Sequence, residues 1–150
     1  DVTIVTQQDG DMPGEQVLVK NAPDVSCEWQ SESNWSVDSG VASYFKGLSG
    51  NWLFIDRGTS TDNRDILVYN ATTHDLVFSD TYAEPIRITD SKLQYWRNIG
   101  DTTTSANCDK YDEAQKIGLS TKLQALVNID LNTPDLKIIK SSERRCQMTQ

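Results

Sequence analysis

The feature that most constrains the fold is a strict alternation of residue types over positions 123–131. Every second position is apolar, namely Leu123, Ala125, Val127, Ile129 and Leu131, and all but one of the positions between them are polar. Successive side chains of a β-strand point to opposite faces of the sheet, so the pattern predicts a half-buried antiparallel strand. Any fold of this chain must supply a sheet with a buried face for this segment.

Other segments have the composition of strands bounded by turn residues. We predict longer strands at 51–56, 65–70, 75–81 and 85–97, the last bent or split at Asp90-Ser91, and shorter ones at 2–6, 16–20, 41–46 and 136–140. One helix is predicted at 107–117, where apolar residues recur at threefold spacing before Gly118. The chain is therefore expected to be all-β, an antiparallel sandwich or barrel of about nine strands with one short helix.

Length and apolar content favour a single domain over residues 1–150. A chain of 150 residues with 37% apolar types buries roughly two thirds of the surface that its unfolded form exposes. Folding therefore requires no metal or dense disulfide framework, and we expect no cofactor. The longest apolar runs have four residues, whereas a membrane-spanning helix needs roughly 20, so we also expect no membrane span.

The negative charge is unevenly distributed. The chain carries −8, and residues 1–40 hold eight acids against one base, Lys20, while the remainder holds fourteen acids and thirteen bases. An acidic chain is repelled by phosphates, so we expect no nucleic-acid binding. If the first 40 residues form one face, that face attracts cations and basic proteins. The alternative is that these acids serve solubility alone.

The cysteines indicate one disulfide and one free thiol. Cys27, Cys108 and Cys146 have no CxxC spacing and share the chain with a single histidine, so a structural zinc site is not expected. We predict a Cys108–Cys146 disulfide, with pairing to Cys27 or three reduced thiols as alternatives. The chain starts at Asp1 without a leader, as a processed secreted protein or a shortened chain does, and we expect it in the periplasm or outside the cell.

Catalytic and metal motifs are weak. His74, the sole histidine, falls in a predicted turn, which is a poor place for a general base. Oxygen-rich loops at 9–15 and 56–65 are of a kind that binds calcium, but neither has EF-hand spacing, and solvated turns are the simpler interpretation. We expect a binding protein rather than an enzyme, with a hydrolase using an unidentified carboxylate pair as the remaining enzyme class.

Two tryptophans suggest a binding surface. Trp29 and Trp35 lie in a polar stretch with Glu28 and Glu32, and an exposed aromatic ring within an acidic surface is a typical anchor for a protein partner. Such rings also stack on sugars, which gives a carbohydrate or envelope-glycan binding module as the alternative function. Trp52 and Trp96 fall inside predicted strands and are expected to pack in the core.

A resemblance narrows the choice of partner. Residues 39–45 (SGVASYF) and 49–59 (SGNWLFIDRGT) resemble small exported bacterial β proteins with an LFxDxGT-type strand and turn. The first segment is also loosely similar to periplasmic lysozyme inhibitors, whose inhibitory loop carries Ser-Gly-x-x-Tyr, although here three residues separate Gly40 from Tyr44. The resemblance implies a non-catalytic inhibitor that inserts a Ser and a Tyr, here Ser39 and Tyr44, into the active cleft of a lysozyme.

These observations together predict a partner-binding surface for a basic protein, with a lysozyme as the specific case. Its expected residues are Glu28, Glu32, Trp35, Asp38, Ser39, Gly40 and Tyr44. The alternative is that Ser39-Gly40 forms an ordinary turn into a strand whose Tyr44 packs internally. The sequence gives no oligomeric state.

Overall fold

The computed structural model describes residues 2–8, 10–21, 26–29, 34–37, 40, 42–60, 63–139 and 141–149. Within these residues the chain forms eleven strands in two sheets and one short helix, and the strand pairs are antiparallel, which confirms the all-β prediction. The chain divides into two compact units. Unit 1 comprises 1–60 and 64–80, and unit 2 comprises 61–63 and 81–150.

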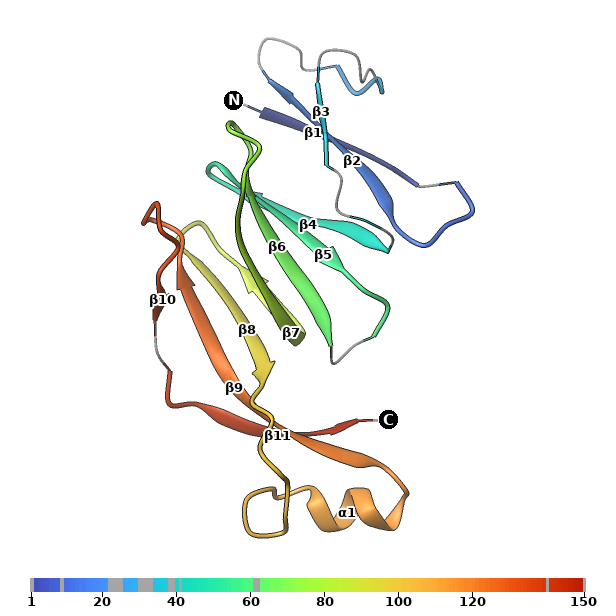
Figure 1. Cartoon of the computed structure of the whole chain (residues 1–150), viewed down its shortest axis with the longest axis vertical. Helices are drawn as coiled ribbons and strands as arrows, with labels where there is room; N and C mark the ends of the chain where they lie inside the picture. The colour runs from blue at the N-terminus through green and yellow to red at the C-terminus, as the bar shows by residue number, and fades with distance from the viewer. Residues whose placement is uncertain are drawn as a thin grey trace. The chain divides into compact units, whose positions relative to one another are not determined.

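Unit 1 is a small sandwich (Figure 1). One sheet has the order β1-β2-β3, and in the other β4, β5, β6 and the first residues of β7 follow one another. The bounds are β1 Val2–Gln8, β2 Glu15–Asn21, β3 Trp35–Ser36, β4 Ser43–Ser49, β5 Trp52–Arg57, β6 Arg64–Asn70 and β7 Leu76–Ile88. Residues of β2, β5 and β6, together with one residue just after β3 and one just after β6, form one core cluster between the sheets: Val17, Val19, Val37, Leu53, Ile55, Leu67, Tyr69 and Ala71.

The central strands of unit 1 explain the two longest apolar runs of the sequence. Leu53 and Ile55 of β5 belong to the core cluster, whereas Phe54 lies between them on the opposite face of the strand and is also fully buried. A strand that is covered on both faces reads as a continuous apolar run instead of an alternation. This is why 52–55 and 66–69 have no polar positions.

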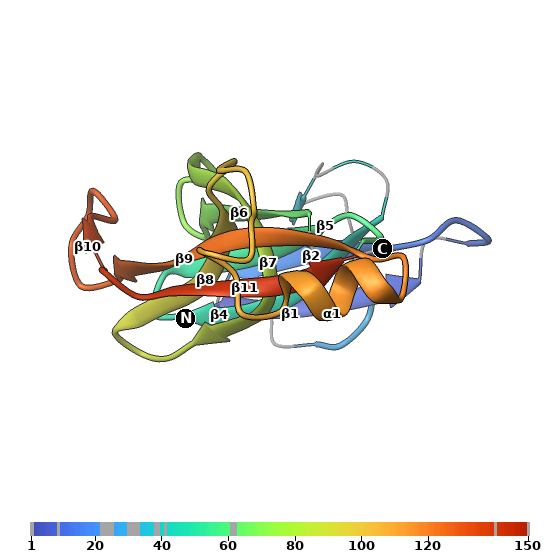
Figure 2. The same cartoon turned by 90° about the horizontal axis from the view of Figure 1, so that it is seen from below.

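Unit 2 is built around β9 (Ser120–Asp130), the strand predicted from the alternation at 123–131. On one side β9 pairs with β8 (Lys92–Asn98), which pairs in turn with β7, and on the other it pairs with β10 (Ile138–Ile139) and with β11 (Arg144–Thr149). The helix α1 (Tyr111–Lys116) lies next to β9 (Figure 2).

The predicted disulfide is confirmed. Cys108 and Cys146 are joined, both are buried, and they form a small cluster with Leu123, against which Tyr111 packs. Cys27 is a free, exposed cysteine. The bridge links the segment that precedes α1 to β11 across 38 positions of the sequence.

Several predicted boundaries differ from the structure. The split at Asp90-Ser91 is confirmed, but β7 runs through 82–84, which was expected to be a turn. The helix covers 111–116 instead of 107–117, and the short strands β3 and β11 were not predicted. A helix of six residues is far too short to span a bilayer, and no other helix occurs in the described part of the chain. β7 passes from unit 1 into unit 2, so no linker separates the two units at this point. The single domain stays a prediction.

Candidate binding site

An open cleft lies in unit 1 between the β1–β2 hairpin and β4. Its volume is about 390 Å³, and we call it the hairpin cleft. It is lined by the end of β1, the hairpin turn, the start of β2 and one aromatic residue of β4: Thr6, Gln7, Gln8, Met12, Pro13, Gly14, Glu15 and Tyr44. Met12 is 52% exposed, so its side chain is accessible from solvent. The cleft therefore offers an apolar contact, an aromatic ring and a carboxylate to an external molecule.

The hairpin turn is held against β4 by backbone contacts. The N–H of Ala42 donates to the carbonyl of Pro13 over 2.8 Å. Gly14 has φ +128°, and a Cβ at this position would lie 3.0 Å from the backbone nitrogen of Ser43. Only glycine combines this backbone conformation with such a close approach. The hairpin turn can therefore lie this close to β4 only with glycine at position 14.

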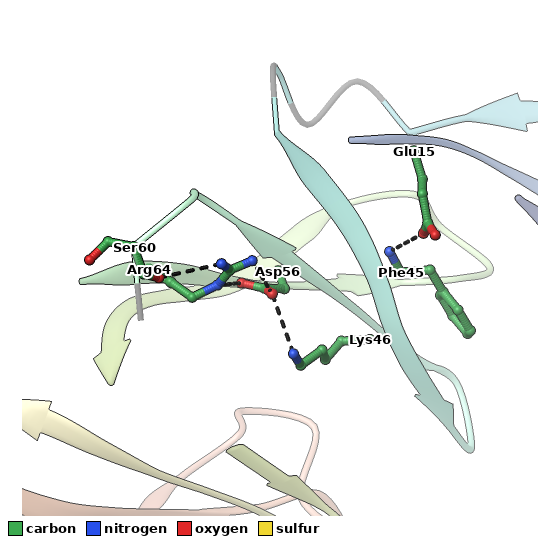
Figure 3. A network of polar contacts seen from close by, with 6 residues as sticks. All are labelled: Glu15, Phe45, Lys46, Asp56, Ser60 and Arg64. Atoms are coloured by element: carbon green, nitrogen blue, oxygen red, sulfur yellow. Dashed lines mark hydrogen bonds and ion pairs between the residues drawn. The ribbon is translucent and has the colours of Figure 1, made fainter. Parts of the chain in front are cut away.

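A side chain completes this attachment. The carboxylate of Glu15 accepts a hydrogen bond of 3.0 Å from the backbone N–H of Phe45 (Figure 3). Phe45 packs against the core cluster of unit 1, so its neighbour Tyr44 points to the other face of β4. The anchoring of Phe45 therefore also sets the position of the Tyr44 ring at the cleft.

On that face, Tyr44 adjoins a buried ionic network. Tyr44 is paired across strands with Asp56, whose side chain is 2% exposed. Arg64 donates from Nε to Oδ1 of Asp56 over 2.7 Å and from its terminal nitrogen to Oδ2, and Lys46 Nζ lies 3.4 Å from Oδ2 (Figure 3). The Arg64 Cζ lies 5.7 Å from the centroid of the Tyr44 ring. Two cations thus compensate one buried carboxylate, and one of them, Arg64, also lies over the Tyr44 ring.

The charge of the molecule is concentrated in unit 1. Its residues include twelve acids and four bases, a net −8, whereas unit 2 has ten of each. All four bases of unit 1 have polar partners within the unit. Lys46 and Arg64 contact Asp56, and Arg57 pairs with Asp65 at 2.8 Å. Lys20 is fully buried, and its Nζ donates to Ser26 Oγ over 2.9 Å.

The seven predicted site residues do not all lie in the described part of the chain. Glu32, Asp38 and Ser39 lie outside the described residues. Glu28 and Gly40 are exposed, and the carbonyl of Gly40 accepts a hydrogen bond of 2.9 Å from the Ser43 hydroxyl. Tyr44 is half-buried and lines the hairpin cleft.

Trp35 does not join Tyr44. Its ring is half-buried and packs against the core cluster, edge-on to Tyr69 at 5.4 Å. It also stacks on His74 with the ring centroids 4.5 Å apart and the planes at 11°. Since the core cluster lies on the Phe45 side of β4, Trp35 of β3 and Tyr44 lie on opposite sides of the sheet that contains β4. The structure therefore separates two residues that the sequence places in one surface.

The two oxygen-rich loops that the sequence raised as calcium candidates are not assembled into metal sites among the described residues. In the second loop, Asp56 and Asp65 receive arginine guanidinium groups. Within the described chain, the one grouping of three potential metal ligands is Cys108, Asp109 and Cys146. Its two cysteines are joined in the disulfide, so they are not thiolate ligands.

Unit 2 contains a larger cleft beside the disulfide. It measures about 740 Å³, and its lining includes residues of both charge signs, among them Asp101, Asp109, Lys110 and Arg144. Arg145 is engaged inside unit 2, because it donates to Gln124 Oε1 and to the carbonyl of Glu84 and stacks on Trp96. Partial burial lowers the pKa of the Arg145 guanidinium. With acids and bases mixed along its wall, this cleft does not concentrate either sign of charge.

Sequence patterns did not identify most of the hairpin cleft. Met12, Glu15 and Gln7 fall in a segment whose composition indicates only a loop and its flanks, and their convergence with Tyr44 depends on a contact between residues about 30 positions apart. Comparisons with known protein families, with curated proteins and with solved structures find no significant match to this chain. The site therefore rests on its own geometry and charge.

Proposed function

We propose that this chain is an exported, non-catalytic binding protein that recognises a basic protein partner through unit 1, with a lysozyme as the specific candidate. The observation that carries the proposal is the charge of unit 1. Its net charge is −8, and its four bases are committed to partners inside the unit. Such a surface raises the encounter rate of a cationic protein and disfavours anionic ones.

The hairpin cleft supplies the contacts that charge alone does not. Met12 and Tyr44 offer apolar and aromatic surface, and the Glu15 carboxylate lies among them. A lysine or arginine side chain has an apolar stem and a charged end, so it matches this combination. The exposed Asp11 in the same turn adds a second acid close in sequence.

The disulfide supports export. Cys108–Cys146 is a buried bridge, and structural disulfides form and persist in oxidising compartments such as the periplasm and the extracellular space. Many lysozymes are basic, so a lysozyme met in such a compartment is the kind of partner that unit 1 would attract. The resemblance of residues 39–45 to lysozyme-inhibitor loops points in the same direction.

The glycan-binding alternative receives less support. Stacking on a sugar needs an aromatic face that is open to solvent, and one face of Trp35 is covered by His74 while Tyr69 packs against it edge-on. Trp29 is half-buried and carries this alternative alone. Glycan binding would show little salt dependence, which separates it from recognition by charge.

The direct test is titration of the full chain with a basic lysozyme, with an acidic protein of similar size as the control. Binding is expected at low ionic strength for the lysozyme alone, and it is expected to weaken as salt is raised. Inhibition of lysozyme activity on cell walls would establish that the chain is a lysozyme inhibitor. Absence of binding to any basic lysozyme at low ionic strength would remove the proposal.

A further inference from the structure

We propose that the outer edge of β1 is a strand-addition site, at which an extended, positively charged segment of the partner pairs with Val2–Gln8 and projects a side chain into the hairpin cleft. This inference rests on the proposed function, because it specifies how the basic partner is held. Strand addition uses main-chain hydrogen bonds for affinity and alternate side chains for specificity.

The first observation is that β1 is an edge strand with one neighbour. It is the terminal strand of the sheet β1-β2-β3, and among the described strands it pairs with β2 alone. The pairing runs from Val2↔Asn21 to Gln8↔Glu15 without a bulge. In such a ladder, alternate residues turn their N–H and C=O groups away from the neighbour, so β1 presents a regular row of these groups along its outer edge.

The second observation is that the sequence of β1 contains none of the residues that usually protect an edge. Its sequence VTIVTQQ contains no charged residue and no proline, and most of its residues are β-branched. Natural edge strands avoid unwanted pairing by charged side chains, proline, bulges or a very short length. A regular, uncharged strand of seven residues is therefore suited to accept another strand.

Two other edge strands of unit 1, β3 and β4, carry protective features that β1 lacks. β4 carries Lys46, has a register irregularity between Phe45 and Gly47, and has its Phe45 N–H occupied by the Glu15 carboxylate. β3 has only two residues. In the described part of the chain, β3 is short and β4 has a lysine, an irregular register and an occupied N–H group, whereas β1 is long, regular and uncharged.

The third observation is continuity between this edge and the hairpin cleft. Thr6, Gln7 and Gln8 belong both to β1 and to the lining of the cleft. A strand of seven residues extends over about 23 Å, so an added strand would follow β1 and end beside the cleft. There its terminal side chains would meet Tyr44 and the carboxylate of Glu15.

Charge selects the occupant. A second copy of this chain would bring another unit of net charge −8 to the same edge, and repulsion between the two opposes pairing. A segment rich in lysine or arginine has the complementary charge. We therefore assign the edge to an extended basic segment of a protein partner.

The test uses a pair of synthetic peptides with the full chain. The probe is Lys-Val-Lys-Val-Lys-Val-Lys, and its matched control is the same peptide N-methylated at every internal amide, which keeps the charge and removes the donors of a β-ladder. The unmethylated peptide should bind at least about tenfold more tightly, because several main-chain hydrogen bonds are lost in the control. Amide exchange of alternate β1 residues should slow in its presence, with no comparable change in β4.

Each other outcome overturns the inference in an identifiable way. Equal binding of both peptides would leave recognition by charge in place and refute strand addition. Equal binding of a Glu-Val analogue would refute the positive charge of the occupant. Slow exchange of β1 amides that depends on chain concentration without peptide would assign the edge to a second copy. Failure of the probe peptide to bind would refute the inference, while the lysozyme titration tests the proposed function separately.

Discussion

The carboxylate of Glu15 accepts a hydrogen bond of 3.0 Å from the backbone N–H of Phe45, and this contact joins the first residue of β2 to the edge strand β4. It occupies a donor that an edge strand would otherwise present to other chains. It also holds the hairpin beside Tyr44. One side chain therefore protects an edge and shapes the hairpin cleft.

Replacing Glu15 by alanine should destabilise unit 1 by about 1–2 kcal/mol, since a hydrogen bond to a charged acceptor is lost. Glu15→Gln keeps a carbonyl acceptor and should recover most of the loss. The free energy of unfolding in urea measures both. Equal destabilisation by the two variants would contradict the role assigned to the hydrogen bond.

Gly14→Ala should destabilise the chain by about 2 kcal/mol or more, because the backbone has φ +128° and the new Cβ would lie 3.0 Å from the nitrogen of Ser43. Gly10→Ala is the matched control in the same turn. Gly10 has φ +57°, and a methyl group added there would have nothing within 4 Å, so a loss of about 1 kcal/mol is expected. Denaturant unfolding measures the loss of unfolding free energy in both variants. Similar losses would show that the close approach of Gly14 to β4 does not contribute to stability.

Arg64→Met should cost about 3 kcal/mol or more, since it leaves the Asp56 carboxylate, 2% exposed, facing Lys46 at 3.4 Å without the arginine that binds both of its oxygens. Arg57→Met is the control. The Arg57–Asp65 pair is 42% and 40% exposed, and its loss should cost about 0–1 kcal/mol. Thermal unfolding compares them, and a larger effect at Arg57 would refute the buried network as a stabilising element.

Removing the disulfide by Cys108→Ser with Cys146→Ser should destabilise unit 2 by about 4 kcal/mol in the chain-entropy model, because the bridge closes a loop over 38 positions. Cys27→Ser should have almost no effect, since Cys27 is free and exposed. Amide exchange in β9 and β11 would report the loss locally. Unchanged exchange in the double variant would show that the bridge does not stabilise these strands.

The alternation at 123–131 predicts β9 but not the burial of its polar face. Gln124 is fully buried, and it donates to Asn98 of β8 and accepts from Arg145 of β11 at 2.6 Å. Asn128 is covered in the same way and accepts from Gln94. These polar residues can be buried because neighbouring strands supply their hydrogen bonds. Strand pairing is a long-range property, so the local pattern indicates one buried face only.

The candidate site shows the same limit. The sequence identifies Tyr44 and the acidic bias of the first 40 residues from local composition. It does not reveal that Trp35 packs on the core side, because its partners Tyr69 and His74 come from β6 and the turn that follows. Nor does it reveal the hairpin cleft, which depends on the approach of Gly14 to Ser43. The disulfide could be predicted from the number and spacing of the cysteines and from the predicted helix near Cys108.

The central claim is that unit 1, not the chain as a whole, attracts a basic partner. The measurement is the association rate constant with a basic lysozyme, as a function of ionic strength, for two double variants that remove the same charge. Asp11→Asn with Glu28→Gln removes exposed acids of unit 1, and Asp90→Asn with Asp135→Asn removes exposed acids of unit 2. The first should slow association about threefold or more at low salt and flatten its salt dependence, while the second leaves the rate nearly unchanged. Equal rates for the two variants would contradict the claim.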